Sequence, residues 1–110
     1  MRILLTSRGE NLEADIDPHF GLAKNFILVD TDTMRFEVIS DNQNLLLSED
    51  GGIQRAKDII PFRPDVVLTG NCGPKTFRVL QSAGVRVIMG AQGKIKDVIQ
   101  SYLTEKYQTS

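Results

Sequence analysis

Short apolar runs alternate with polar, glycine-rich segments along the chain, a pattern typical of buried strands joined by loops. Five such runs predict strands, near residues 2–7, 25–30, 35–40, 65–70 and 85–89. The run RFEVIS (35–40) alternates in polarity, as expected of a strand with two different faces. The short connection TDTM before it favours a hairpin with the preceding strand.

Three further segments carry apolar residues at helical spacing. They predict helices near residues 52–60, 74–83 and 94–106. Pro61 and Pro64 end the first helix, because proline cannot continue the hydrogen-bond ladder. Pro74 is suited to begin the second, and Gly84 is placed to cap its C-terminus.

The order strand-strand-strand-helix-strand-helix-strand-helix predicts an α/β fold with one mixed five-stranded sheet and helices on its faces. Strand 2–7 should lie parallel to 65–70, with 25–30 antiparallel on its other side. The carboxyl edge of the parallel strands is then formed by four connecting segments: 8–24, 41–52, 70–74 and 90–94. All three helix N-termini should point to this edge, where α/β sheets bind ligands and free N–H groups favour anions.

The composition indicates one ordinary soluble domain over residues 1–110, with 41% hydrophobic and 25% charged residues. A net charge of −1 gives no electrostatic footprint for nucleic acid. No apolar stretch is long enough for a membrane span or a signal peptide, and a single cysteine excludes a disulfide within the chain. We therefore expect a cytoplasmic protein.

The single cysteine, Cys72, follows the fourth predicted strand and precedes a helix. A helix N-terminus lowers the pKa of a thiol, so we expect an exposed and reactive thiolate. It could act as a nucleophile with His19, bind a soft metal, or simply fill a tight turn. The sequence leaves these three interpretations open.

His19 lies in the loop at the same edge, between Pro18 and Phe20. It could orient the loop by hydrogen bonding or offer a nitrogen to a metal. One histidine and one cysteine cannot fill a tetrahedral zinc site, so cluster sulfurs or a second subunit would have to complete the shell. The alternating carboxylates Glu13, Asp15 and Asp17 are better explained by solubility than by a hard-metal site.

Two glycine-rich turns open predicted helices, at Gly51-Gly52 and at Gly73-Pro74. Glycine in these places is ordinary turn chemistry. The bare backbone amides would also cradle an anionic ligand. Both interpretations can hold together, because amides bound to water are available to a ligand.

Four segments together resemble the dinitrogenase iron–molybdenum cofactor biosynthesis family, in particular its small stand-alone members. They are DPHFG (17–21), GGIQRA (51–56), TGNCGPKTFRVLQSAGVRV (69–87) and MGAQGKIKDVIQSY (89–102). The resemblance implies a ribonuclease-H-like mixed α/β fold. It also implies a role related to nitrogen fixation, in which the protein binds iron–molybdenum cofactor or its metal–sulfur precursors without catalysing a reaction.

We therefore predict a carrier of an anionic metal–sulfur cluster, either iron–molybdenum cofactor or another molybdenum or iron–sulfur species, rather than an enzyme. Its partners would be cluster donor and acceptor proteins, and a weak homodimer could form through an edge strand such as 35–40. The predicted binding residues are Arg8, His19, Gly51, Gly52, Asn71, Cys72, Gly73 and Lys75, with Cys72 and His19 as metal contacts.

The alternative is a regulatory or scaffold module that binds a protein partner or a small anion at the same edge, without metal. A metal-dependent nuclease fits less well. Two-metal chemistry needs carboxylates on the central strands. The first strand RILLTS has none, and Asp30 and Asp65 should lie at the opposite edge.

Overall fold

The computed structural model describes residues 1–40 and 51–104. The strands are β1 (Arg2–Ser7), β2 (Asn25–Asp30), β3 (Arg35–Ser40), β4 (Val66–Leu68) and β5 (Arg86–Ile88). The helices are α1 (Gly51–Ile59), α2 (Pro74–Ser82) and α3 (Ile95–Leu103), with 3-10 helices η1 (Phe20–Leu22) and η2 (Ile60–Phe62). None of these helices is long and apolar enough to cross a membrane.

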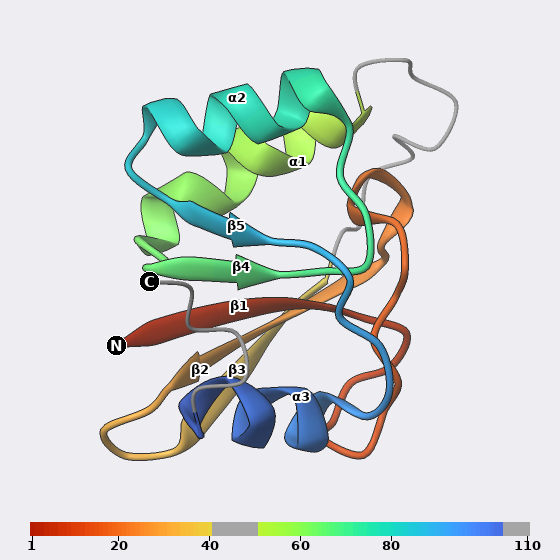
Figure 1. Cartoon of the computed structure of the whole chain (residues 1–110), viewed down its shortest axis with the longest axis vertical. Coiled ribbons are helices and arrows are strands. Elements are labelled where there is room, and N and C mark those ends of the chain that lie inside the picture. The colour runs from red at the N-terminus through yellow and green to blue at the C-terminus, as the bar shows by residue number, and fades with distance from the viewer. Residues whose placement is uncertain (41–50, 105–110) are drawn as a thin grey trace.

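One mixed sheet with the strand order β3-β2-β1-β4-β5 runs through the molecule (Figure 1). β1 pairs antiparallel with β2 and parallel with β4, and β4 pairs parallel with β5. The predicted fold class and the predicted neighbours of the first strand are therefore confirmed. Asp65 lies at the amino edge, as expected, where its carboxylate accepts the backbone N–H of Arg2 at 2.8 Å.

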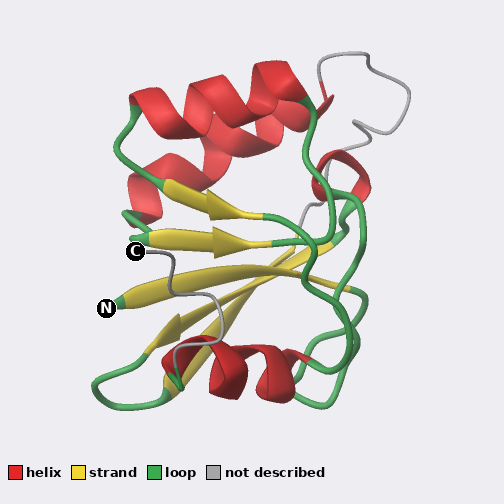
Figure 2. Ribbon diagram, viewed as in Figure 1, coloured by secondary structure: helices red, strands yellow, loops and turns green. Residues whose placement is uncertain are grey.

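Helices cover both faces of the sheet: α1 and α2 lie on one face and α3 on the other (Figure 2). Each face has its own core. Leu4 packs on the side of α1 and α2, whereas Ile3 and Leu5 pack on the side of α3. All three are fully buried. β1 is thus apolar on both faces, which explains why RILLTS is a continuous apolar run.

The predicted boundaries hold within a few residues, except that β4 and β5 are shorter than expected. β4 stops at Leu68 and β5 at Ile88, because the chain bends near Gly70 and Gly90 to form the carboxyl edge. Gly90 has a φ of 89°, a conformation that glycine adopts without strain. Gly84, with a φ of 81°, follows α2 as the predicted cap. Most of the predicted edge segment 41–52, and the end of the predicted helix 94–106, lie outside the described residues.

Candidate functional site at the carboxyl edge

Three chain segments lie side by side at the carboxyl edge. The backbone N–H of Phe20 donates to the carbonyl of Asn71 at 3.0 Å, and a parallel bridge pairs His19 with Asn71. The N–H of Gly90 donates to the carbonyl of Gly70 at 2.9 Å. The loop before η1, the turn after β4 and the loop after β5 therefore form one continuous surface, as the topology predicted.

Buried polar contacts fix this surface from below. The hydroxyl of Thr6 donates to the carbonyl of Asp17 at 2.7 Å and lies 2.9 Å from the hydroxyl of Thr69. Gly70 packs directly against the loop, since a Cβ atom there would lie 2.7 Å from Pro18 Cα. The glycine in the turn is needed for this close approach.

His19 projects from a well-anchored loop. Its backbone N–H donates to Asp17 Oδ1 at 3.0 Å. The next residue, Phe20, is 1% exposed, and its ring centroid lies 5.4 Å from that of Phe26. Because its neighbours are fixed and its own side chain is exposed, His19 is available to a ligand at the surface.

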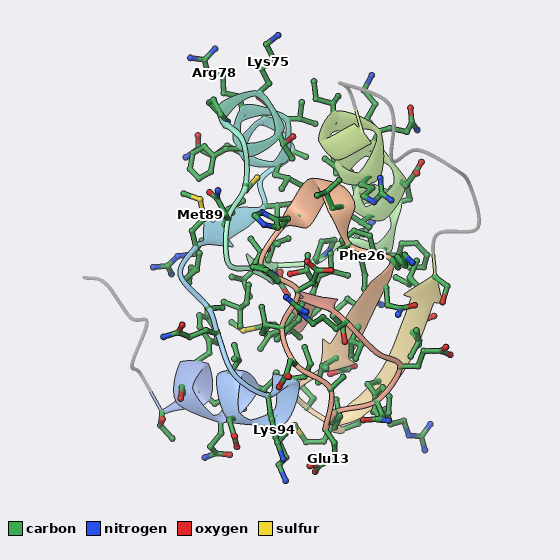
Figure 3. All side chains as sticks on the ribbon, turned by 90° about the vertical axis from the view of Figure 1, so that its right-hand side faces the viewer. Glu13, Phe26, Lys75, Arg78, Met89 and Lys94 are labelled. Carbon is green, nitrogen blue, oxygen red and sulfur yellow. The ribbon has the colours of Figure 1, made fainter. Side chains whose placement is uncertain are left out.

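The N-terminus of α2 is open to solvent. Gly73 caps the helix in an extended conformation, with no side-chain hydrogen bond, and a Cβ atom placed on it would meet no atom within 4 Å. Among the described residues, the backbone amides of Gly73, Lys75 and Thr76 have no acceptor. Lys75 and Arg78 extend from the same helix into solvent (Figure 3). Free amides, the helix dipole and two cations all favour an anion here.

Cys72 differs from the prediction. The side chain is 8% exposed and packs in the core beneath α1 and α2, in the cluster that contains Leu4 and Phe20. Burial raises the pKa of the Cys72 thiol, because desolvation disfavours the thiolate. The expectation of an exposed thiol with a lowered pKa is therefore wrong. A buried neutral thiol is not the species that attacks a substrate or binds a metal.

The side chain of Asn71 stabilises the turn. Its Oδ1 accepts the backbone N–H of Cys72 at 2.9 Å. Asn71 is exposed, so its side-chain NH₂ group remains able to donate to a ligand.

Gly52, the second glycine of the pair at α1, has a packing role. A Cβ atom on Gly52 would lie 2.6 Å from Thr76 Oγ1, and one on Gly21 would lie 3.3 Å from Gly52 Cα. η1, α1 and α2 thus meet at Gly52, beside the loop that carries His19. Gly51 is the first residue of α1.

The expectation that all three helices offer free N-terminal amides is wrong for α3. The N–H groups of Ile95 and Lys96 donate to the carbonyls of Ala14 and Leu12, at 2.8 and 3.0 Å. Glu13 adds ion pairs to Lys94 at 3.4 Å and to Lys96 at 2.6 Å. The loop after β1 therefore caps α3, and little of this helix end is left for a ligand.

The remaining predicted residues of this loop are spread along it. Arg8 is exposed, and its backbone N–H donates to the carbonyl of Asp15 at 2.9 Å. Glu13, Asp15 and Asp17 form no metal site, and within residues 1–40 and 51–104 no group of three histidine, cysteine or acidic side chains could hold a metal ion.

Sequence reasoning missed Met89 and Arg78. Met89 is 45% exposed and follows β5, between Ile88 and Gly90, which bond to the turn after β4. Figure 3 shows it on the same face of the molecule as Lys75 and Arg78. A methionine directly before a glycine at the end of a predicted strand is a signal that the sequence did contain. A hollow of about 420 Å³, lined by Arg2, Arg35, Glu37 and Phe62, lies elsewhere, beside β3.

Together these features define a class: a small α/β domain whose carboxyl edge presents backbone amides and cationic side chains. The chain belongs to the dinitrogenase iron–molybdenum cofactor family, which it matches over residues 1–105. The family resemblance seen in the four sequence segments is thereby confirmed.

Solved structures support the same assignment. The apo form of the orange protein from Desulfovibrio gigas is 34% identical, with a TM-score of 0.92, over 99% of this chain and 92% of that protein. The NMR structure of a proposed NifB protein from Thermotoga is 22% identical, with a TM-score of 0.77, over 96% and 89% of the two chains, and it supports the fold alone. No curated protein matches the chain.

Proposed function

We propose that the protein binds and carries an anionic metal–sulfur cluster at its carboxyl edge and hands it on without catalysing a reaction. Iron–molybdenum cofactor and a molybdenum or iron–sulfur precursor are the cargo classes that family membership favours. The orange protein bears a colour in its name and was solved in an apo form, both of which suit a relative that binds a coloured ligand. Cluster donor and acceptor proteins are the partners that this function requires.

The open N-terminus of α2 is the single observation that carries the proposal. Three amides without an acceptor in the described chain, at Gly73, Lys75 and Thr76, stand beside the empty space at Gly73. Binding with micromolar affinity needs about 8 kcal/mol. Hydrogen bonds to a charged group contribute about 1.5–3 kcal/mol each, so several amides together with a cation reach that range.

The predicted binding residues take unequal parts in this proposal. Gly73, Lys75 and Asn71 contact the cargo directly, and His19 supplies a nitrogen ligand or a hydrogen bond from the adjacent loop. Arg8 contributes positive charge from a greater distance. Met89 offers a soft, polarisable contact to sulfide.

Gly52 acts mainly by allowing η1 and α2 to close on α1, and Gly51 begins that helix. Cys72 supports the turn from the core. Its proposed part as a metal contact would require the thiol to leave that core, so we assign the metal contact to His19 first.

Anaerobic titration tests the proposal. Tetrathiomolybdate and isolated iron–molybdenum cofactor are added separately to the protein, followed by desalting, visible absorption, and metal and sulfide analysis. We expect at least one of them to be retained. Gly73→Val should abolish retention by filling the space before the amides, whereas Ser82→Val at the far end of α2 should not.

If neither probe binds, the proposed carrier function is rejected. That result would instead favour the regulatory or scaffold module that uses the same edge without metal. Equal retention by Gly73→Val and the parent protein would remove the α2 N-terminus from the site even if a cluster binds.

A further inference from the structure

β3 forms the outer strand of the sheet, and its second edge is unpaired in the part of the chain that the structure describes. Within residues 1–40 and 51–104, only β2 pairs with it. Its first three residues, Arg35, Phe36 and Glu37, are all exposed, and Phe36 exposes 42% of its surface. The open backbone edge of such a strand is a template for another strand.

The two faces of β3 carry different chemistry. Glu37 pairs in register with Leu28, whose side chain packs in the core beneath α1 and α2. Arg35 shares that face because side chains alternate along a strand. Phe36 pairs with Val29 and therefore lies on the α3 side. One face of the edge thus carries a cation and an anion two residues apart, and the other carries an exposed aromatic ring.

We propose that the edge of β3 pairs with the same edge of a second copy of this chain, antiparallel, with Phe36 opposite Phe36 on the two-fold axis. In this register Arg35 of each copy faces Glu37 of the other. Two cross-strand ion pairs then form on one face and an aromatic pair on the other. A two-fold interface requires this kind of self-complementary surface.

The charge pattern selects this register over its neighbours. In an antiparallel pair of identical strands, the residue on the two-fold axis faces its own copy. Centring on Arg35 would set Arg35 opposite Arg35, and centring on Glu37 would set Glu37 opposite Glu37, so either neighbouring register brings like charges together. Within the described residues neither Arg35 nor Glu37 takes part in an ion pair, so both are available. The register centred on Phe36 is the one that pairs both charges.

The dimer is weak and leaves the carboxyl edges open. Exposed ion pairs and cross-strand pairs each contribute at most about 1 kcal/mol, so the dimer forms only at high protein concentration. β3 runs parallel to β1, because both are antiparallel to β2. Antiparallel pairing of two β3 strands therefore directs the two carboxyl edges to opposite ends of the dimer. The interface is independent of the proposed cluster site.

Sedimentation velocity over a wide concentration range tests the interface on the full chain. The parent protein should pass from monomer to dimer as its concentration rises. Arg35→Glu gives two acidic positions on each edge, and Glu37→Arg gives two basic ones. Each variant alone should dimerise roughly tenfold more weakly, because both pairs become repulsive.

An equimolar mixture of the two variants should restore the dimer as a heterodimer, because every pair then joins an acid to a base. Arg78→Glu is the matched control: it reverses an exposed charge on α2, which packs beside β5 at the other side of the sheet, and should dimerise like the parent. A parent protein that stays monomeric throughout would overturn the proposal. So would a dimer unaffected by either single variant, or a mixture that fails to associate while both variants remain folded by circular dichroism.

Discussion

Phe20 donates its backbone N–H to the carbonyl oxygen of Asn71 across 3.0 Å, and this bond joins the loop that carries His19 to the turn that opens α2. The two segments are far apart in the chain, yet they form one surface. We propose this surface as the cluster site because of the family membership and the open amides of α2. Substitutions at its separate parts should have distinct effects.

Gly70 and Gly73 should respond differently to the same substitution. Gly70→Ala places a methyl group 2.7 Å from Pro18 Cα, so the loop must shift, and we expect a loss of about 1–3 kcal/mol in the free energy of unfolding. Gly73→Ala places its methyl group in open space at a φ of −66°, which any residue adopts, and should change stability by less than about 0.5 kcal/mol. Urea denaturation of both variants checks this. A larger loss for Gly73→Ala would contradict the observed turn geometry.

Cys72 should behave as a buried thiol. Iodoacetamide should modify it much more slowly than a free thiol at neutral pH, and the rate should rise only at higher pH because burial raises the pKa of the thiol. Urea should expose it and restore the ordinary rate. Rapid modification of the native protein at neutral pH would mean that the side chain reaches the surface.

Cys72→Ser should destabilise the protein by about 1–3 kcal/mol, because it places a hydroxyl in an apolar cluster. Cys72→Ala, which adds no polar group, provides the comparison and should be milder. If the cargo binds through amides and His19, both variants should still retain it. Loss of cargo from folded Cys72→Ala would identify the thiol as a ligand after all.

Lys75→Glu should weaken cargo binding roughly tenfold, since it replaces a favourable charge near the α2 amides with a repulsive one. The salt dependence of binding should fall at the same time, because fewer exposed charges contribute. Lys57→Glu is the matched control, an exposed reversal in the last turn of α1. Equal effects of the two variants would indicate a general charge effect rather than a local contact.

Glu13 should contribute a small, pH-dependent stabilisation. The hydrogen bond from Lys96 lowers the pKa of Glu13 in the folded protein, so the contribution is present above the unfolded pKa of about 4.3 and is lost as the pH falls through the lowered folded value. Glu13→Gln should therefore melt slightly below the parent at neutral pH and converge with it in acid. The effect is small because the pair is exposed to solvent. A melting-temperature difference that grows toward low pH would have the wrong sign for this ion pair.

The sequence by itself determined the strands and α-helices, their order, the neighbours of the first strand and the hairpin of β2 and β3. The apolar run of β1 and the glycine and proline signals around α2 are local features, and such local patterns report buried strands and helix ends directly. The meeting of residues 17–21 and 70–74 at one edge also followed from the sequence, because the directions of parallel strands are fixed by their connections.

Only the tertiary structure decided which groups at that edge remain open. Cys72 precedes α2, as the sequence predicted, but its side chain points into the core. Desolvation there raises the pKa of the thiol despite the dipole of the adjacent helix. Nothing in the sequence distinguishes the N-terminal amides of α3 from those of α2, but in the folded protein the carbonyls of Leu12 and Ala14 accept from the α3 amides. Side-chain direction and hydrogen-bond partners depend on residues distant in the chain, so no local pattern could have assigned them.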